Sequence, residues 1–171
     1  MNRTLLISTA AAAAGAALAF QAAAQAAAPA PQLVGVARAV SAAEAALGGK
    51  AFEAELDHER GVLVYEVNLV KDGRALSADI DAVTGKLVRQ SKAPPIPTPF
   101  DRGALRAAQT APRTLSETIA MVEASTKGRV TGVDLEQSGG RAYYEVELAG
   151  AADRDVRVDL LTGAITPMID D

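Results

Sequence analysis

Hydrophobic positions beyond residue 33 change their spacing from a helical to an alternating pattern. Over 36–47 they recur at the interval of one helical face, and Gly48-Gly49 follows as a stop signal. From 52 to 56 apolar and acidic residues alternate, which is typical of a half-buried strand. Two more alternating stretches, 62–69 and 76–80, follow after turn signals. This pattern predicts one helix followed by a three-stranded antiparallel meander.

The same order returns later in the chain. At an offset of 79 residues, Tyr65-Glu66-Val67 corresponds to Tyr144-Glu145-Val146. One residue is lost in the next connection, so that "DAVTG" at 81–85 corresponds to "DLLTG" at 159–163. A match that keeps its spacing over some fifty residues indicates duplication.

The second copy has its own helix and strand signals. Thr114 with Glu117 fits a capping box at the start of a helix that ends before Gly128. Strands are expected over 130–137, 141–148 and 155–160, and short tail strands at 87–88 or 164–165.

The sequence therefore predicts an α+β fold with two repeated modules, each one helix packed on a three-stranded antiparallel meander. "SKAPPIPTPFDRG" separates the modules, and its prolines favour an extended, semi-rigid spacer. Residues 104–110 are expected to form a short helix within it. The expected organisation is a signal peptide at 1–26, a disordered lead-in at 27–33, module 1 at 34–90, a Pro-rich linker at 91–112 and module 2 at 113–171.

The amino-terminal segment has the features of an export signal. Arg3 precedes a mostly apolar stretch from Leu5 to Phe20, and Ala24-Gln25-Ala26 fits a signal peptidase site. The stretch is shorter than the roughly 20 residues of a membrane span. We therefore expect a secreted, periplasmic protein cleaved after Ala26, with no stable membrane insertion afterwards. The chain has no cysteine, which excludes disulfides and acylation at cysteine.

The charge balance narrows the class of partner. Loss of Arg3 with the signal leaves 16 of the 17 Lys and Arg against 21 Asp and Glu. Nucleic acid and anionic lipid both require clustered cations, so neither is expected as a partner. The chain has no tryptophan and few other aromatic residues, so aromatic platforms for bases or sugars are not expected either.

Candidate chemistry is sparse. Asp79, Asp81, Asp155 and Asp159 could be metal ligands, but the Asp-x-x-Thr-Gly pattern favours a turn in which the carboxylate accepts backbone N–H groups. His58 is the single histidine and lies beside a predicted turn. No serine lies in a nucleophile-elbow context. We therefore predict no enzyme activity, no catalytic residue, no cofactor and no metal site.

The helix ending in "GG", the "VYEV" strand and the "DAVTGKLV" finish resemble a PepSY domain, and "YYEVEL…VDLLTGAI" resembles a second. The resemblance covers 36–89 and 114–165. At "LAGAADRD" the second hairpin is longer than the first and lacks the Asp-Gly turn. The resemblance implies an exported or envelope-associated module, of a kind also found in propeptides of thermolysin-type metallopeptidases and proposed to restrain peptidases. It implies no catalytic residue.

These observations predict a non-catalytic periplasmic interaction module that binds a protein or peptide and regulates a peptidase. An accessory or sensory subunit of an envelope signalling or metal-responsive system is the alternative. The expected interaction surface lies on the sheet face away from the helices, where a partner could contact side chains or an edge strand could accept an extended peptide. An alternative for Val62 and Val64 is that both fill a packed interface between the modules. The surface comprises Val62, Val64, Glu66, Tyr143 and Glu145.

Overall fold

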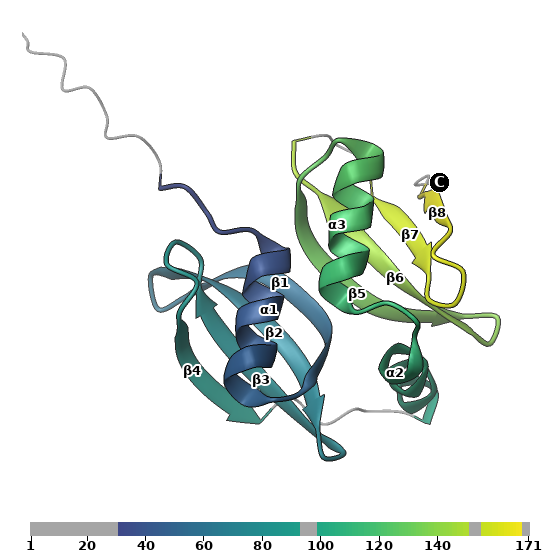
Figure 1. Ribbon diagram of the computed structural model, residues 1–171, viewed down its shortest axis with the longest axis horizontal. Coiled ribbons are helices and arrows are strands. Elements are labelled where there is room, and N and C mark those ends of the chain that lie inside the picture. The colour runs from purple at the N-terminus through teal and green to yellow at the C-terminus, as the bar shows by residue number, and fades with distance from the viewer. Residues whose placement is uncertain (1–30, 93–98, 151–154, 169–171) are drawn as a thin grey trace, which may run out of the picture. The chain divides into compact units, whose positions relative to one another are not determined.

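The computed structural model describes residues 31–92, 99–150 and 155–168 of the 171-residue chain. The predicted signal peptide, most of the lead-in, the prolines at 94–97 and part of "LAGAADRD" lie outside the described residues. Module 1 forms one helix and four strands in sequence order (Figure 1). They are α1 (Val36–Leu47), β1 (Lys50–Glu59), β2 (Val62–Lys71), β3 (Arg74–Asp81) and β4 (Leu87–Lys92).

Module 2 repeats this order after an additional helix. That helix, α2, contacts β5 and β6 and begins five residues before the predicted one. No described helix is long and apolar enough to cross a membrane. The elements are α2 (Pro99–Thr110), α3 (Leu115–Thr126), β5 (Val130–Ser138), β6 (Arg141–Leu148), β7 (Val156–Asp159) and β8 (Ile165–Pro167).

The predicted α+β fold class is confirmed, and both tail strands are present as β4 and β8. The structure adds a feature that the periodicity did not predict. The eight described strands form one antiparallel sheet in the order β4-β3-β2-β1-β5-β6-β7-β8. Its two halves meet where β1 pairs with β5, at Ala54 opposite Val133 and Glu55 opposite Gly132. The first strand of each module therefore pairs with the first strand of the other. This pairing satisfies backbone donors and acceptors that would be free if β1 and β5 were edge strands.

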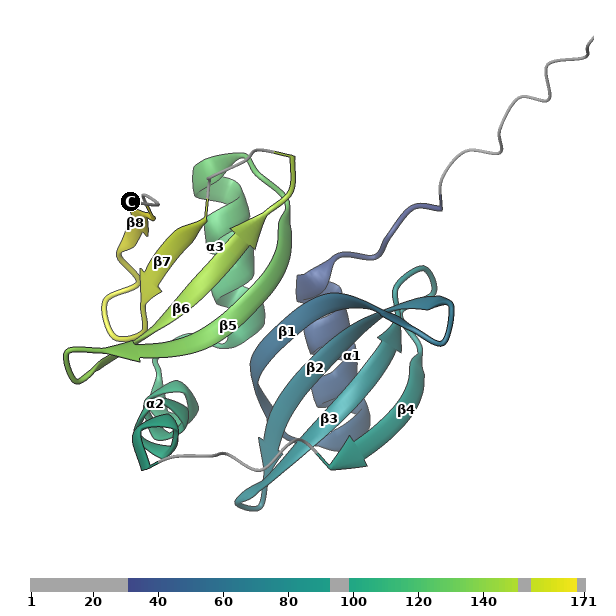
Figure 2. The ribbon, with the colours of Figure 1, turned by 180° about the vertical axis from the view of Figure 1, so that it is seen from behind.

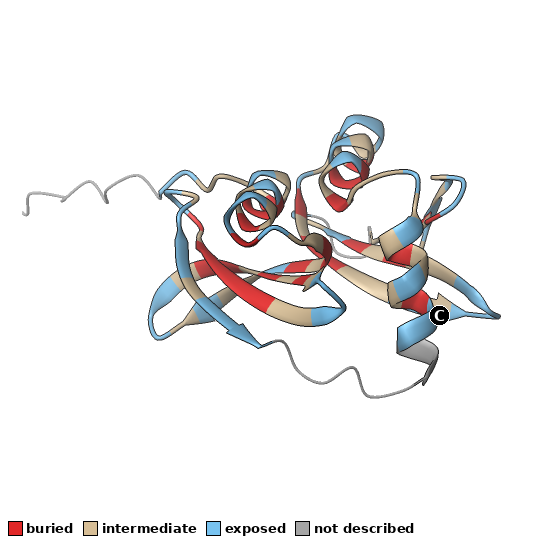
Figure 3. Cartoon of the chain, turned by 60° about the horizontal axis from the view of Figure 1, so that its bottom comes forward, coloured by how far each residue is buried: buried red, intermediate tan, exposed pale blue. Residues whose placement is uncertain are grey.

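Apolar side chains form one continuous core between the helices and the sheet. In Figure 3 the buried parts of the helices face the strands. The core cluster contains residues of both modules, and α1 and α3 contact each other. Tyr65 and Tyr144, which are equivalent in the repeat, are each 2% exposed. The core is mainly aliphatic, as expected for a chain without tryptophan.

Helix termini and turns follow the sequence signals. Thr114 and Glu117 form the predicted capping box, and Gly48 ends α1 in the left-handed conformation at φ 69°. In α3 the corresponding left-handed position is occupied by Lys127, directly before Gly128. The 59–62, 71–74 and 138–141 connections are two-residue hairpin turns whose central residues all have positive φ.

The duplication extends to a hydrogen bond that the sequence analysis missed. Glu44 Oε1 accepts the backbone N–H of Ala51 at 2.9 Å, and Glu123 Oε1 accepts that of Val130 at 3.0 Å. In each module a helix carboxylate therefore satisfies a backbone donor at the start of the first strand. Both strands also bulge at the equivalent place, one residue further on.

Side chains also connect the two modules beside the strand pair. Lys50 Nζ donates to the carbonyl oxygens of Gln109 at 2.9 Å and Ala111 at 3.4 Å. Arg129 donates to the carbonyl of Leu33 at 3.0 Å. The first two contacts connect β1 to the end of α2, and the third connects the residue before β5 to the segment before α1.

Candidate interaction surface

The outer face of the sheet is the face away from α1 and α3. It points toward the viewer in Figure 2, where the ribbon is seen from behind. The predicted surface residues belong to this face because they alternate with the core positions of β2 and β6. The structure does not join them into one patch, since β1 and β5 lie between β2 and β6.

The two valines differ in exposure. Val62 is 47% exposed at the start of β2. Val64 is 1% exposed, although it is not part of the core cluster between helices and sheet. Only Val62 can therefore contact a partner without rearrangement. Neither residue lies in β1 or β5, the strands that pair between the modules.

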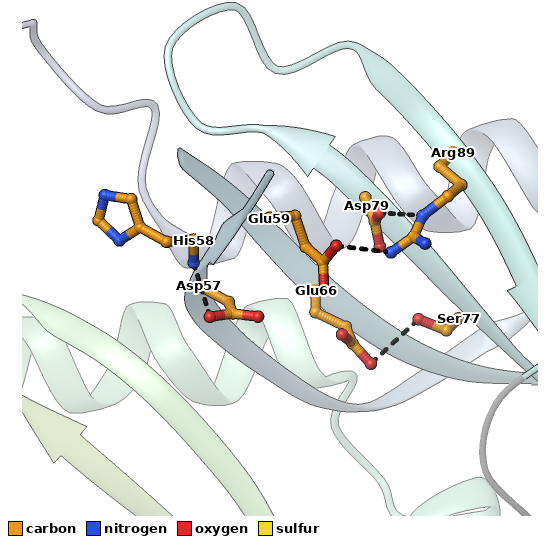
Figure 4. Close-up of polar contacts among 7 residues, drawn as sticks. All are labelled: Asp57, His58, Glu59, Glu66, Ser77, Asp79 and Arg89. Atoms are coloured by element: carbon orange, nitrogen blue, oxygen red, sulfur yellow. Dashed lines mark hydrogen bonds and ion pairs between the residues drawn. The ribbon is translucent and has the colours of Figure 1, made fainter. Parts of the chain in front are cut away.

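The polar side chains of module 1 pair among themselves on this face, as Figure 4 shows. Arg89 Nε donates to Asp79 Oδ2 at 2.6 Å, and its Nη2 lies 3.3 Å from Glu59 Oε2. Ser77 Oγ donates to Glu66 Oε1 at 3.2 Å. Asp79 is 3% exposed, so this ion pair neutralises a buried carboxylate.

His58 takes no part in this network. Its backbone N–H donates to Asp57 Oδ1 at 2.6 Å, while its imidazole points away from the other labelled side chains (Figure 4). Within the described ranges, no three His, Cys, Asp or Glu side chains are grouped so that they could hold a metal ion.

The Asp-x-x-Thr-Gly segments perform the predicted turn role. Asp81 Oδ1 accepts the N–H of Thr84 at 2.7 Å and its hydroxyl at 2.8 Å, and also the N–H of Val83 at 3.1 Å. Asp159 makes the same three contacts in module 2, at 2.8, 2.9 and 3.0 Å. These hydrogen bonds to the threonine backbone and hydroxyl lower the pKa of both aspartates, because they favour the charged form.

Around the β1–β5 pair, the outer face carries carboxylates. Glu53 and Glu55 on β1 lie beside Asp134 on β5, and two more carboxylates follow on β6. Burial raises the pKa of all five, and in four of them repulsion from Asp134 raises the pKa further. Sequence analysis identified Glu145 but not the central position of Asp134, which depends on pairing between the modules. We call this set the seam carboxylates: Glu53, Glu55, Asp134, Glu145 and Glu147.

The raised and lowered pKa values predict a maximum of stability at mildly acidic pH. A carboxyl with a raised pKa in the folded state takes up protons on folding, so stability rises as the pH falls from neutral toward the unfolded value of about 4. Below about pH 4 this gain is complete, and stability falls as Asp81 and Asp159, whose pKa is lowered, become protonated. Thermal unfolding followed by circular dichroism from pH 3 to 8 at constant ionic strength should give a Tm that is higher near pH 5 than at pH 7.5 or 3.

Asp134→Asn is the matched variant for this prediction, because it removes the charge that repels four other carboxylates. It should raise Tm at pH 7.5 and reduce the increase between pH 7.5 and 5. High salt should have a similar, smaller effect by screening. A Tm of the wild type that stays constant or falls between pH 7.5 and 5 would contradict the assignment.

In module 2 the outer face also carries an arginine on an aromatic ring. The guanidinium carbon of Arg157 lies 3.9 Å from the centre of the Tyr143 ring. Arg157 was not identified from the sequence, since a single arginine in an alternating strand gives no local signal.

Fold and surface together define a tandem α+β protein whose two helix-and-sheet modules share one sheet. The family model described as "Peptidase propeptide and YPEB domain" (PepSY) matches residues 34–90 and 114–166. The chain belongs to this family, and both matches confirm the predicted tandem modules. The family is of the propeptide and inhibitor type and is generally non-catalytic.

The comparison with curated proteins found no match. Among solved structures, a crystal structure described as a candidate lipoprotein from Clostridium difficile 630 is similar to this chain at 15% identity. The similarity covers 79% of this chain and 92% of that one, with a TM-score of 0.45.

Proposed function

We propose that this protein is an exported, non-catalytic module that binds an extended segment of a protein partner and thereby restrains a peptidase. The observation that carries the proposal is the PepSY match over both modules, because the family description names peptidase propeptides. Export is supported by the signal-like features of residues 1–26, and cleavage after Ala26 belongs to the same proposal. The mass of the protein recovered from the periplasm would test the cleavage position.

The free edges of the sheet support binding of an extended segment. Among the described residues (31–92, 99–150 and 155–168), β4 pairs only with β3 and β8 pairs only with β7. A segment that adds to such an edge gains backbone hydrogen bonds and needs little side-chain complementarity. β4 is the better candidate because it has six residues against three in β8, and β8 ends with Pro167, which has no N–H. Val88 on β4 is 59% exposed and can contact the added segment.

Proline substitutions in β4 test this proposal. Neighbouring residues in a strand direct their N–H groups to opposite sides, so one of Gln90 and Ser91 donates toward β3 and the other toward the free edge. Gln90→Pro and Ser91→Pro therefore remove one donor of each kind. The assay is the rate at which a thermolysin-type metallopeptidase hydrolyses a fluorogenic peptide with and without this protein. The variant that keeps the wild-type Tm should lose inhibition at least tenfold.

The second proline variant is the internal control, because it should lower Tm by breaking a hydrogen bond between β3 and β4. Absence of inhibition by the wild type at micromolar concentration would refute the restraint of this class of peptidase. Full inhibition by a variant that keeps its Tm would refute binding at the β4 edge.

A further inference from the structure

A cavity of about 270 Å³ opens on the outer face of module 2. It is lined by residues of β6, β7 and β8, by Ser138 at the end of β5 and by Ala164 between β7 and β8. None of the seam carboxylates lines it. Arg141 and Tyr143 come from β6, Arg157 and Asp159 come from β7, and Thr166 comes from β8. The cavity is therefore lined by two arginines on a face that is otherwise rich in carboxylates.

The carboxylate in the cavity is already engaged. Asp159 Oδ1 accepts three hydrogen bonds from its own turn, at 2.8, 2.9 and 3.0 Å. Arg141 lowers the pKa of Asp159 by its charge, but no ion pair within 4.0 Å joins them among the described residues. Asp159 is thus the carboxylate that lines the cavity, and it is held by its own turn. The charge of Arg157 also counteracts the rise that burial causes in the pKa of Glu145, although Glu145 does not line the cavity.

Arg157 has an unsatisfied donor. Its Nε is buried and has no hydrogen-bond partner among the residues that the structure describes. In the strand register Arg157 lies opposite Glu145, yet no ion pair within 4.0 Å joins these two among the described residues, and the guanidinium stacks on Tyr143 instead. Burial of an N–H without a partner is unfavourable, so the guanidinium of Arg157 is not fully satisfied by the side chains around it.

The position in module 1 that is equivalent to Arg157 does form a cross-strand ion pair. There the residue corresponding to Arg157 is Asp79, which lies opposite Glu66 on one side and Arg89 on the other. Module 1 thus forms its own buried ion pair between two adjacent strands. In module 2 the residue on the last strand opposite Arg157 is Thr166, which carries no charge. Module 2 therefore has an arginine on the outer face that forms no ion pair within 4.0 Å among the described residues, although Glu145 lies opposite it.

We propose that this cavity binds a carboxylate of an extended peptide, with Arg157 as the principal ligand and Arg141 as the second cation. Arginine binds carboxylates through paired hydrogen bonds from its planar guanidinium, and the stacking on Tyr143 fixes the orientation of the Arg157 guanidinium. The carboxylate is either an acidic side chain or the carboxyl terminus of the peptide. The proposal rests on the peptide-binding function above and adds to it a carboxylate site in module 2, at the opposite end of the sheet from β4.

The test follows the Arg157 Nε–Hε resonance in ¹⁵N-labelled protein during titration with three blocked peptides. N-acetyl-Gly-Gly has a free carboxyl terminus, N-acetyl-Gly-Glu-Gly-amide has an internal acid, and N-acetyl-Gly-Gln-Gly-amide has neither. At least one acidic peptide should shift the resonance to saturation, with affinity at least tenfold above that of the neutral peptide. Whichever acidic peptide binds more tightly identifies the source of the carboxylate. Inorganic phosphate is titrated separately.

Three variants make the result specific, with binding followed at backbone amides near the cavity. Arg157→Gln should abolish saturable binding, and Arg157→Lys should weaken it at least fivefold because lysine lacks the planar fork. Arg74→Gln removes an exposed arginine at the start of β3 and should leave binding unchanged. If Arg157→Gln does not fold, Arg141→Gln replaces it, with an expected loss of at least threefold.

Equal shifts with neutral and acidic peptides, unchanged binding in Arg157→Gln or Arg141→Gln, or saturable binding of phosphate alone would each overturn the proposal. The titration contains no peptidase, so its failure would leave inhibition through β4 intact. Conversely, absence of peptidase inhibition would not exclude saturable binding of an acidic peptide at Arg157.

Discussion

Replacing Ile119 by alanine is expected to lower the free energy of unfolding of both modules together. Ile119 lies in α3 and is 0% exposed, within the core cluster that both modules share. Truncation of a buried isoleucine removes apolar contacts and leaves a cavity, at a cost of about 2–5 kcal/mol. Because the core is continuous, we expect the loss to appear in module 1 as well as in module 2.

Urea unfolding followed by circular dichroism gives the total loss, and hydrogen exchange measured by mass spectrometry locates it. Amides of β2 in module 1 should exchange faster in Ile119→Ala than in the wild type, in parallel with amides of β6. Val88→Ala is the control, because Val88 is 59% exposed and its truncation should change stability little. Faster exchange confined to module 2 would show that the modules unfold independently.

Gly49→Ala is expected to have the second large effect. A Cβ at Gly49 would lie 2.8 Å from the backbone oxygen of Val70 and still closer to a methyl group of Leu69. The backbone oxygen belongs to β2 and cannot rotate away, so β1 and β2 would have to separate at this point. We expect a loss of about 3 kcal/mol, at the upper end of the range for overpacked sites.

The repeat provides the control for this prediction. Gly128 is the equivalent residue in module 2, but the atoms nearest to its Cβ would be side-chain atoms of Thr126 and Leu148, at 3.2 and 3.3 Å. Side-chain atoms can move, so Gly128→Ala should cost less than about 1 kcal/mol. Thermal and urea unfolding of both variants would check the difference. A loss in Gly128→Ala as large as in Gly49→Ala would show that the backbone contact is not the cause.

Local elements of the fold could be predicted because each is encoded by neighbouring residues. Thr114 and Glu117 lie three positions apart and satisfy each other, so their pattern identifies the start of α3. Asp81 and Asp159 likewise bond within their own turns. These contacts join residues that are two or three positions apart, so the residue types at that spacing are enough to predict them.

The pairing of β1 with β5 could not be predicted in the same way. Ala54 and Val133 are ordinary inward positions of two alternating strands, and nothing in either strand specifies the other as its neighbour. The seam carboxylates depend on this pairing, and so their central residue, Asp134, was not identified. The burial of Val64 and the position of Arg157 above Tyr143 likewise depend on contacts across strands.

The pairing at the centre of the sheet has a consequence for the origin of the chain. Ala54 and Val133 occupy the same position in the two repeats and lie directly opposite each other. Antiparallel pairing of equivalent residues is the arrangement that a two-fold axis produces in a symmetric homodimer. The protein thus has the architecture of two fused subunits, in which fusion keeps the dimer contact and frees each half to diverge. Asp79 and Arg157 mark one such divergence, because the acid in module 1 forms an ion pair with Arg89, whereas the arginine in module 2 stacks on Tyr143 and lines the cavity.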